Sequence, residues 1–390
     1  MRALPSEGSL AGSARSVAAP FLLSRLWVGL FAYLGAARHG YLAPVAGGWA
    51  GVANPVLNPW TLFDSRNYLE IASHGYRPLT ATFFPLYPLL LRLAGTDPLH
   101  QAAWGVALSS AAFAAGLALV HRLTDIEHGP VPARLAAWLL AFFPVSAVFS
   151  AVYSDALFLA LLAATWLLLR RDHWGWALLP ALAAGVTRNS GLVVTAALAV
   201  EWWLRSRRGW CSTPRVAAAI TVAAPLAGLL AVEAYLGHRF GNPLAGVSSQ
   251  QAYGRHLTLP WAPVLGDLGD LLAGRDVNAV TVLSLLTTVG AVLLVIHPRR
   301  TQSPAYPVLV LGIIAMQLVY SRTFAPYLNS SLRFLATTFP FIQLLALEAI
   351  PLLGGGPATR RRRGLLLGAG YLILCALFSF QFGDKAFVTG

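Results

Sequence analysis

Charged side chains are scarce in this 390-residue chain. They make up 11% of the residues, while hydrophobic residues make up 57% and the mean hydropathy is +0.63. Ordinary globular proteins carry roughly a quarter charged residues, so too few charges remain here to cover a soluble surface. The composition therefore excludes a soluble enzyme, a disordered chain and a fibrous protein, and it predicts a polytopic membrane protein.

Cysteine and lysine are nearly absent. Cys211 falls in a basic loop and Cys375 in an apolar segment, which argues against a disulfide or a cysteine-ligated metal site. Arginine supplies 27 of the 28 basic residues, a bias that is typical of a GC-rich bacterial genome. The net charge of +13 does not indicate nucleic-acid binding, because the densest basic runs lie between apolar segments, where they orient a membrane protein.

About eleven apolar segments approach the length of about 20 residues that a membrane-spanning helix needs. They are expected at 19–37, 99–121, 133–152, 155–170, 174–187, 190–204, 215–237, 277–296, 304–321, 331–352 and 365–382. Residues 1–18 are polar and small, and the apolar stretch after them lacks a convincing cleavage site, so the first helix is expected to be retained.

The distribution of basic residues predicts the orientation. With the N-terminus inside, sixteen basic residues lie in short cytoplasmic connections and eleven in longer outer segments. Two long loops, 38–98 and 238–276, then lie outside, and residues 83–94 predict an interfacial or re-entrant helix. No repeat or soluble module interrupts the chain, which predicts a single transmembrane domain over residues 1–390.

The segment from Phe63 to Tyr76 gathers the densest set of reactive side chains. Asp64, Ser65, Arg66, Tyr68, Glu70 and His74 fall within eleven residues. On a helix that starts at Asp64, Tyr68, Ile71 and Ala72 share one face at the outer membrane boundary. Asp64 is then either a reactive carboxylate or a helix cap that accepts backbone hydrogen bonds.

Further polar groups are expected on the same outer side. Asp155 follows Tyr153 and Ser154, and it either caps the next helix or joins Asp64 in one pocket, as a base and an orienting group or as ligands of a divalent ion. Arg188 and Arg333 sit at helix boundaries, where an arginine needs an internal carboxylate or a lipid phosphate.

Other ionisable residues carry weaker signals. The nine histidines lack metal-binding spacing, and Glu233 and Glu348 near helix ends are expected to be structural. The acids of the second outer loop, Asp267, Asp270 and Asp276, are candidates to join the site but are expected rather to face water. No nucleotide-binding loop is present, which argues against a nucleotide sugar as substrate.

Taken in order, these motifs resemble the PIG-V-like mannosyltransferases, a branch of the GT-C membrane glycosyltransferases. The resemblance runs from about residue 20 to 345 and rests on Phe63-Asp64-Ser65, Tyr68, Ile71-Ala72, Gly75-Tyr76, Phe83-Phe84-Pro85-Leu86-Tyr87-Pro88, Pro144, Ser146, Phe149, Tyr153-Ser154-Asp155, Leu157-Phe158, Thr187-Arg188-Asn189-Ser190-Gly191 and Arg333-Phe334. The chain departs from the family pattern at Phe63, where tryptophan is usual, at Asn67, where an aromatic residue is common, and at Asp155, where glutamate is frequent.

The resemblance implies a GT-C-like fold and the transfer of a hexose, with mannose as the expected sugar. The donor would be a polyprenyl-phosphate sugar and the acceptor a lipid or glycan, on the outer face of a bacterial plasma membrane. Asp64 would be the base of an inverting reaction, with Asp155 orienting the acceptor. Arg188, Arg333 and Arg66 would pair the donor phosphate, and the substrate groove would be lined by Ser65, Tyr68, His74, Tyr76, Phe84, Tyr87, Tyr153 and Asn189.

Two alternatives stay open from the sequence. A lipid-linked sugar transporter or flippase would also need outer carboxylates and buried arginines, but its polar residues would concentrate at mid-membrane and its repeats would show symmetry. A non-catalytic membrane subunit would tolerate the departures at Phe63 and Asn67. The sequence demands no cofactor, and a divalent cation at Asp64 and Asp155 is the one addition considered.

Overall fold

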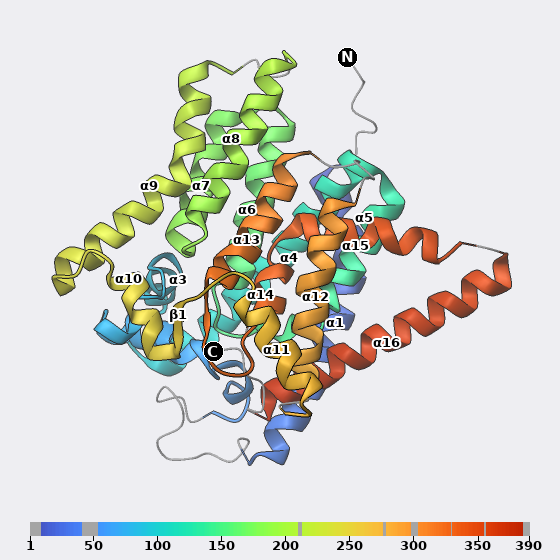
Figure 1. The fold of residues 1–390 in the computed structure, drawn as a ribbon, viewed down its shortest axis with the longest axis horizontal. Helices are drawn as coiled ribbons and strands as arrows, with labels where there is room; N and C mark the ends of the chain where they lie inside the picture. Colours follow the sequence, from blue (N-terminus) through green and yellow to red (C-terminus); the bar gives the residue numbers. More distant parts are fainter. Residues whose placement is uncertain are drawn as a thin grey trace.

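The computed structural model describes residues 9–40, 54–209, 213–275, 278–297, 303–328, 330–354 and 356–384. Nearly all of the regular secondary structure is helical (Figure 1). The helices are α1 (Leu10–Arg38), α2 (Asp64–His74), α3 (Leu86–Leu91), α4 (Pro98–His128), α5 (Pro130–Ala141), α6 (Asp155–Arg170), α7 (Trp174–Thr187), α8 (Gly191–Arg207), α9 (Arg215–Phe240), α10 (Ala245–Ser248), α11 (Ala262–Leu272), α12 (Ala279–Ile296), α13 (Ala305–Val319), α14 (Ser331–Ala336), α15 (Phe339–Leu352) and α16 (Pro357–Gly383). Two short strands, β1 (Arg255–Leu257) and β2 (Tyr320–Arg322), pair antiparallel with Arg255 opposite Arg322.

Several helices are suited to a bilayer. Within the described ranges, five are long and apolar enough to cross a membrane, namely α1, α4, α9, α12 and the part of α16 from Arg361 to Gly383. The helices α7, α13 and α15 are apolar but shorter. The prediction of a helical multi-pass membrane protein is confirmed, whereas the total of eleven spans stays a prediction. Cys211 and Asp276 lie outside the described residues.

The expected continuous helix over 133–152 is interrupted, which corrects that prediction. Helix α5 ends at Ala141, because the residue that precedes Pro144 is disfavoured in a helical conformation. The Arg25 guanidinium of α1 donates to the carbonyls of Ala141 (3.2 Å) and Ser146 (3.0 Å), which satisfies acceptors that the break would leave unpaired. A single arginine within the first helix therefore stabilises the turn that leads to Tyr153 and Asp155.

The expected helix over 331–352 is also broken. Helix α14 ends at Ala336, and α15 restarts at Phe339 with Pro340 in its first turn, where the missing N–H has no intrahelical partner to lose. The interruption leaves α14 as a short, separate helix, and this helix carries Arg333.

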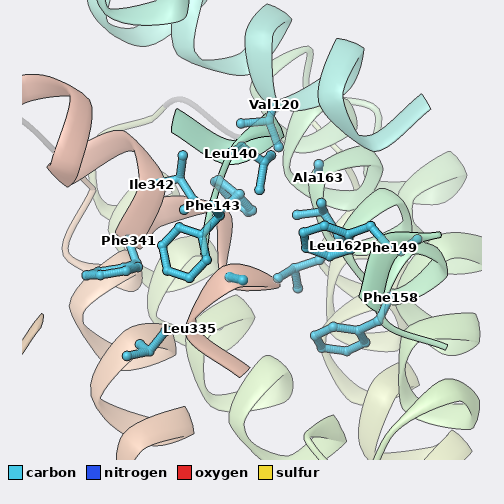
Figure 2. Packing of buried hydrophobic residues seen from close by; sticks show 14 of the residues in the cluster. Val120, Leu140, Phe143, Phe149, Phe158, Leu162, Ala163, Leu335, Phe341 and Ile342 are labelled. Carbon is cyan, nitrogen blue, oxygen red and sulfur yellow. The ribbon is translucent and has the colours of Figure 1, made fainter. Parts of the chain in front are cut away.

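An aromatic core lies between α4, α5, α6, α14 and α15 (Figure 2). Phe143 meets the ring of Phe341, and Phe149 stacks on Phe113 with 4.5 Å between ring centroids. Phe158 of α6 belongs to the same cluster, and it also lies 5.6 Å from the Arg188 guanidinium. The core therefore extends directly to the charged residues at the start of α6.

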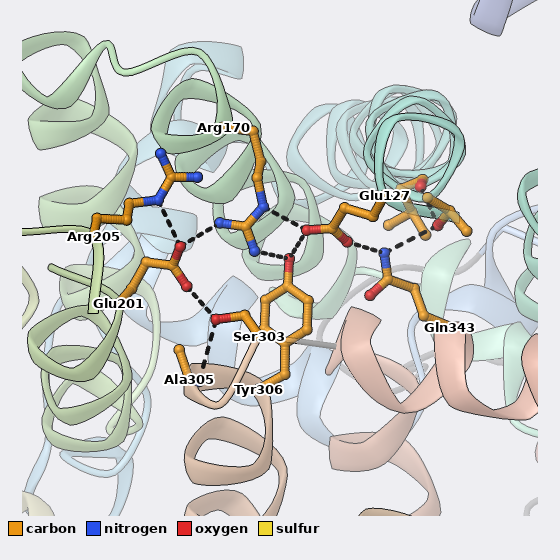
Figure 3. A network of polar contacts seen from close by, with 10 residues as sticks. Glu127, Arg170, Glu201, Arg205, Ser303, Ala305, Tyr306 and Gln343 are labelled. Atoms are coloured by element: carbon orange, nitrogen blue, oxygen red, sulfur yellow. Dashed lines mark hydrogen bonds and ion pairs between the residues drawn. The ribbon is translucent and has the colours of Figure 1, made fainter. Parts of the chain in front are cut away.

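The opposite end of α6 carries a buried ionic network (Figure 3). Sixteen residues of helix separate the two ends by roughly 22 Å. Arg170 donates to Glu127 and Glu201, both at 2.5 Å, and to the Tyr306 hydroxyl at 2.9 Å. Arg205, Ser303 and Gln343 complete the hydrogen bonds of the two glutamates. The network joins α4, α6, α8, α13 and α15 at one level of the bundle.

Helices α1 and α16 approach each other through glycine. A Cβ atom at Gly35 would overlap the backbone carbonyl of Phe380, so we expect Gly35→Ala to force the helices apart and to lower the free energy of unfolding by roughly 1–3 kcal/mol. Gly29 on the same helix has open space around its Cβ position, and Gly29→Ala should be neutral or stabilising. Thermal unfolding of the two variants in detergent tests this contrast; equal melting temperatures would contradict it.

Candidate active site

Asp64 is the first residue of α2, and strained backbone precedes it. Phe63 adopts φ 52° and ψ −119°, a region that non-glycine residues rarely occupy and that costs on the order of 1–3 kcal/mol. The Asp64 side chain caps no backbone group, so the alternative of a helix cap is wrong. Its Oδ2 accepts a hydrogen bond from Arg333 Nη1 at 2.6 Å, and its Oδ1 accepts none from a described residue. One carboxylate oxygen is thus available to a substrate.

Arg333 links the two aspartates. It is 6% exposed on α14, and its Nε lies 3.2 Å from Asp155 Oδ1 while its Nη1 binds Asp64. The guanidinium lies 5.1 Å from the ring centroid of Tyr153, whose hydroxyl accepts a hydrogen bond from the Asp64 amide at 3.2 Å. Ser330, just before α14, also has a positive φ of 70°. Strained residues therefore precede both helices that form the Asp64–Arg333 pair.

Asp155 lies behind this pair and does not cap α6. It is fully buried, and its Oδ1 accepts from Arg188 Nη1 at 2.6 Å, whereas its Oδ2 has no partner among the described residues. Arg188 follows the last residue of α7 in an extended conformation and stacks on Phe334 at 4.4 Å from the ring centroid. Arg188 and Arg333 thus pair with internal carboxylates, which is one of the two alternatives predicted from the sequence.

Helix α11, in the segment 238–276, holds the chain that precedes α14. The Asp267 carboxylate of α11 accepts hydrogen bonds from the backbone amides of Tyr327 (2.9 Å) and Leu328 (3.0 Å). Asp267 is fully buried, so the prediction that it faces water is wrong. Two backbone donors leave this carboxylate well satisfied, and they fix the chain that leads to Ser330 and Arg333.

Asp64 faces a cavity of about 90 Å³, which we call the Asp64 cavity. It is lined by Asp64, Tyr68, Thr82, Phe83, Phe84, Thr187, Arg188, Asn189, Gln250, Tyr253, Arg255, Ser330, Arg333 and Phe334. A second cavity of about 260 Å³, the Glu233 cavity, shares Thr82, Phe84, Asn189, Gln250, Arg255 and Phe334 with it and extends between α9, α10 and α13. Asp155 lines neither cavity, so the two aspartates differ in their access to a substrate.

Arg255 of β1 is a member of the site that carries no sequence motif. It lines both cavities, and its guanidinium donates to the Ser330 hydroxyl at 3.4 Å and lies 6.0 Å from the Phe334 ring centroid. No carboxylate in the described part of the chain pairs with it. Burial, together with the neighbouring Arg333 charge, lowers the pKa of Arg255 to about 10, which still leaves a cation at neutral pH.

Only part of the predicted groove meets at these cavities. Tyr68, Phe84 and Asn189 line the Asp64 cavity, and the Tyr68 hydroxyl is within hydrogen-bond distance of Ser154 at 2.7 Å. Three other predicted residues have buried hydroxyls with internal partners: Ser65 donates to Trp60, Tyr87 to Gly105, and Tyr153 to Leu62.

The remaining predicted residues lie elsewhere. His74 and Tyr76 line a separate cavity of about 610 Å³ beside α7 and α9, and Arg66 lies on the exposed side of α2 without lining a described cavity. In the described ranges, no three His, Cys, Asp or Glu side chains lie together as a metal-binding group. A divalent cation at Asp64 and Asp155 stays a prediction, and Arg333 already contacts one oxygen of each carboxylate.

Part of the chain is similar in sequence to known mannosyltransferases. A family model described as mannosyltransferase (PIG-V) matches residues 45–203. The chain is similar to GPI alpha-1,6-mannosyltransferase 2 of Rattus norvegicus, with 35% identity over 210 residues that cover 50% of this chain and 40% of the relative. It is also similar to the Mus musculus protein of the same name, with 34% identity over 167 residues that cover 39% of this chain and 32% of the relative. The chain thus spans less than half the length of these curated relatives.

Among solved structures, the oligosaccharyltransferase of Archaeoglobus fulgidus is similar at 14% identity with a TM-score of 0.48, covering 90% of this chain and 53% of that one. The segment matched by the family model includes Asp64, Asp155 and Arg188, and it ends before Arg255 and Arg333. The resemblance that the ordered motifs predicted is confirmed over this segment, where residues 45–203 match the mannosyltransferase (PIG-V) family model.

Proposed function

We propose that this protein is a multi-pass GT-C-type glycosyltransferase that moves mannose from a polyprenyl-phosphate donor to a lipid or glycan acceptor. The observation that carries the proposal is the Asp64 carboxylate, which binds Arg333 through one oxygen and lines the Asp64 cavity. The family match of residues 45–203 supports mannose as the sugar. The arginine distribution supports a site on the outer face of a bacterial plasma membrane.

The charges around the Asp64 cavity support an anionic donor. Arg188, Arg255 and Arg333 face it, and the two aspartates of the cluster neutralise Arg188 and Arg333. Arg255 keeps an unbalanced positive charge at the junction of both cavities. A guanidinium in this position suits a phosphate group, whose departure it would favour by pairing the negative charge.

The reaction follows from this arrangement. Asp64 Oδ1 accepts the proton of the acceptor hydroxyl while that oxygen attacks the anomeric carbon, on the face opposite the phosphate. The bond between the anomeric carbon and the phosphate oxygen breaks with its electron pair leaving on the phosphate, which remains beside Arg255. The sugar configuration inverts. Asp155 holds Arg188 and Arg333 in place and lines neither the Asp64 cavity nor the Glu233 cavity.

The proposal is tested with the purified protein in lipid nanodiscs. Radiolabelled polyprenyl-phosphate mannose and a host lipid and glycan extract are supplied, and label is followed into product. Transfer into a lipid or glycan is the expected result. Donor binding without transfer would contradict the assignment as a transferase and favour a lipid-linked sugar transporter or a non-catalytic subunit. Absence of donor binding would contradict the assignment of the donor as a polyprenyl-phosphate sugar.

Arg255→Gln should raise the KM for the donor by roughly 10–100-fold with a smaller change in kcat, because it removes a charged partner of the phosphate in the bound state. Arg66→Gln is the matched control, since Arg66 is exposed on α2 and lines no described cavity. Equal KM values for the two variants in the same transfer assay would remove Arg255 from the donor site.

A further inference from the structure

Glu233 of α9 is a carboxylate that the proposed chemistry does not use. It lies near the end of an apolar helix and lines the Glu233 cavity. No cation of the described residues pairs with it, and its one hydrogen bond is accepted from the Gly246 amide at 3.2 Å. An unpaired acid among apolar helices is costly, so it is expected to have a ligand.

Besides Glu233, Arg255 and the hydroxyl residues Thr82, Ser190 and Tyr320, the polar lining of this cavity consists of neutral amides. Gln317 of α13 has a buried Nε2 atom without a hydrogen-bond partner, and Asn189 and Gln250 line the same space. Gln250 Nε2 donates to the Thr82 hydroxyl. Phe84, Ile313 and Met316 supply apolar surface. A carboxylate, several amides and an aromatic ring match a sugar ring, which offers hydroxyl donors and acceptors on its edge and C–H groups on its faces.

The charge distribution sets the direction in which a ligand lies. Arg255 stands where the two cavities meet, and Glu233 lines only the larger one. A phosphate is attracted by Arg255 and repelled by Glu233, so the Glu233 cavity favours an uncharged, hydroxyl-rich group over a second phosphate.

Gly246 brings the backbone close enough to hold the carboxylate. A Cβ atom at this position would overlap Glu233 Oε1, so any side chain here displaces the carboxylate from its backbone donor. The Gly246→Ala substitution therefore moves the acid without removing its charge, and it offers a second, independent way to disturb the cavity.

We propose that the Glu233 cavity is a hexose-binding subsite in which Glu233 and Gln317 bind vicinal hydroxyl groups. This inference rests on the proposed function for the identity of the sugar, mannose. The hexose belongs either to the donor, as the group to be transferred, or to the acceptor, and the binding experiment separates these two sources.

Equilibrium binding is measured on the full-length protein in nanodiscs, so that no turnover is needed. The probes are polyprenyl-phosphate mannose, bare polyprenyl phosphate and methyl α-mannoside, the last followed by saturation-transfer NMR. Glu233→Gln and Gly246→Ala are expected to weaken binding of the mannosylated donor by roughly 10–100-fold while bare polyprenyl phosphate binds as before, because only the sugar loses its charged hydrogen bond. That result assigns the subsite to the donor sugar.

Unchanged donor binding with a lost methyl α-mannoside signal assigns the subsite to the acceptor sugar instead. The proposal is overturned if both variants bind all three probes with the affinity of the unchanged protein. It is also overturned if the variants lose affinity equally for mannosylated and bare polyprenyl phosphate. Glu70→Gln is the matched control, because Glu70 is paired with Arg77 on α2 and lines no described cavity. If wild-type protein binds the sugar but transfers none, the proposed function fails while the subsite stands.

Discussion

Asp64→Asn is expected to reduce the rate of sugar transfer by roughly 10²–10⁴-fold, the usual contribution of a general base. Asparagine has nearly the same shape, and its carbonyl oxygen can still accept the hydrogen bond that Arg333 donates to Asp64 at 2.6 Å. It cannot take up the proton of the acceptor hydroxyl. The loss should therefore appear in kcat, with donor affinity close to that of the unchanged protein.

The single-turnover rate with labelled donor, measured beside equilibrium donor binding, separates these two effects. Asp97→Asn is a suitable control, because Asp97 caps α4 on the surface and asparagine caps a helix equally well. Transfer by Asp64→Asn at more than a tenth of the normal rate would exclude Asp64 as the base.

Arg170→Met should lower the free energy of unfolding by about 3–5 kcal/mol, the largest stability change that we expect in this chain. Arg170 is the shared partner of Glu127 and Glu201, and its removal leaves two buried carboxylates without that cation. Methionine preserves most of the side-chain volume, so the effect reports on charge rather than packing. Chemical unfolding in detergent, followed by tryptophan fluorescence, measures the change.

Charge compensation distinguishes this explanation from a cavity effect. Combining Arg170→Met with Glu127→Gln and Glu201→Gln should recover much of the lost stability, because the buried negative charges disappear with their partner. Arg205→Met is a milder control, since Glu201 keeps Arg170. If the triple variant is as unstable as Arg170→Met alone, the network does not act through charge.

The helices could be predicted from sequence because an apolar run of sufficient length has few alternatives in a membrane. Hydropathy did not locate the two helix breaks, although Pro144 and Pro340 beside them are helix-breaking signals in the sequence. Arg25 stabilises the first break, and its guanidinium reaches a carbonyl 116 residues away in the sequence. Hydropathy alone does not contain that contact.

The members of the ionic cluster were predicted better than their roles. Orientation placed Asp64, Asp155, Arg188 and Arg333 on one side of the membrane, and the family resemblance marked them as a set. Their pairing depends on tertiary contacts such as Asp64–Arg333, which are separated by 269 residues. Arg255 could not be found, because neither motif nor spacing distinguishes it from other loop arginines.

The glycine contact between α1 and α16 also has a consequence for biosynthesis. Gly383 packs against the backbone of Ala32, about 350 residues earlier in the chain. At a translation rate of roughly 5–20 residues per second, α1 is made some 20–70 s before the residue that packs on it. During this interval, the small residues on that face of α1 must be covered by lipid or by the insertion machinery. Substitutions at Gly35 and Gly383 should therefore reduce yield during membrane insertion as well as the stability of the finished protein.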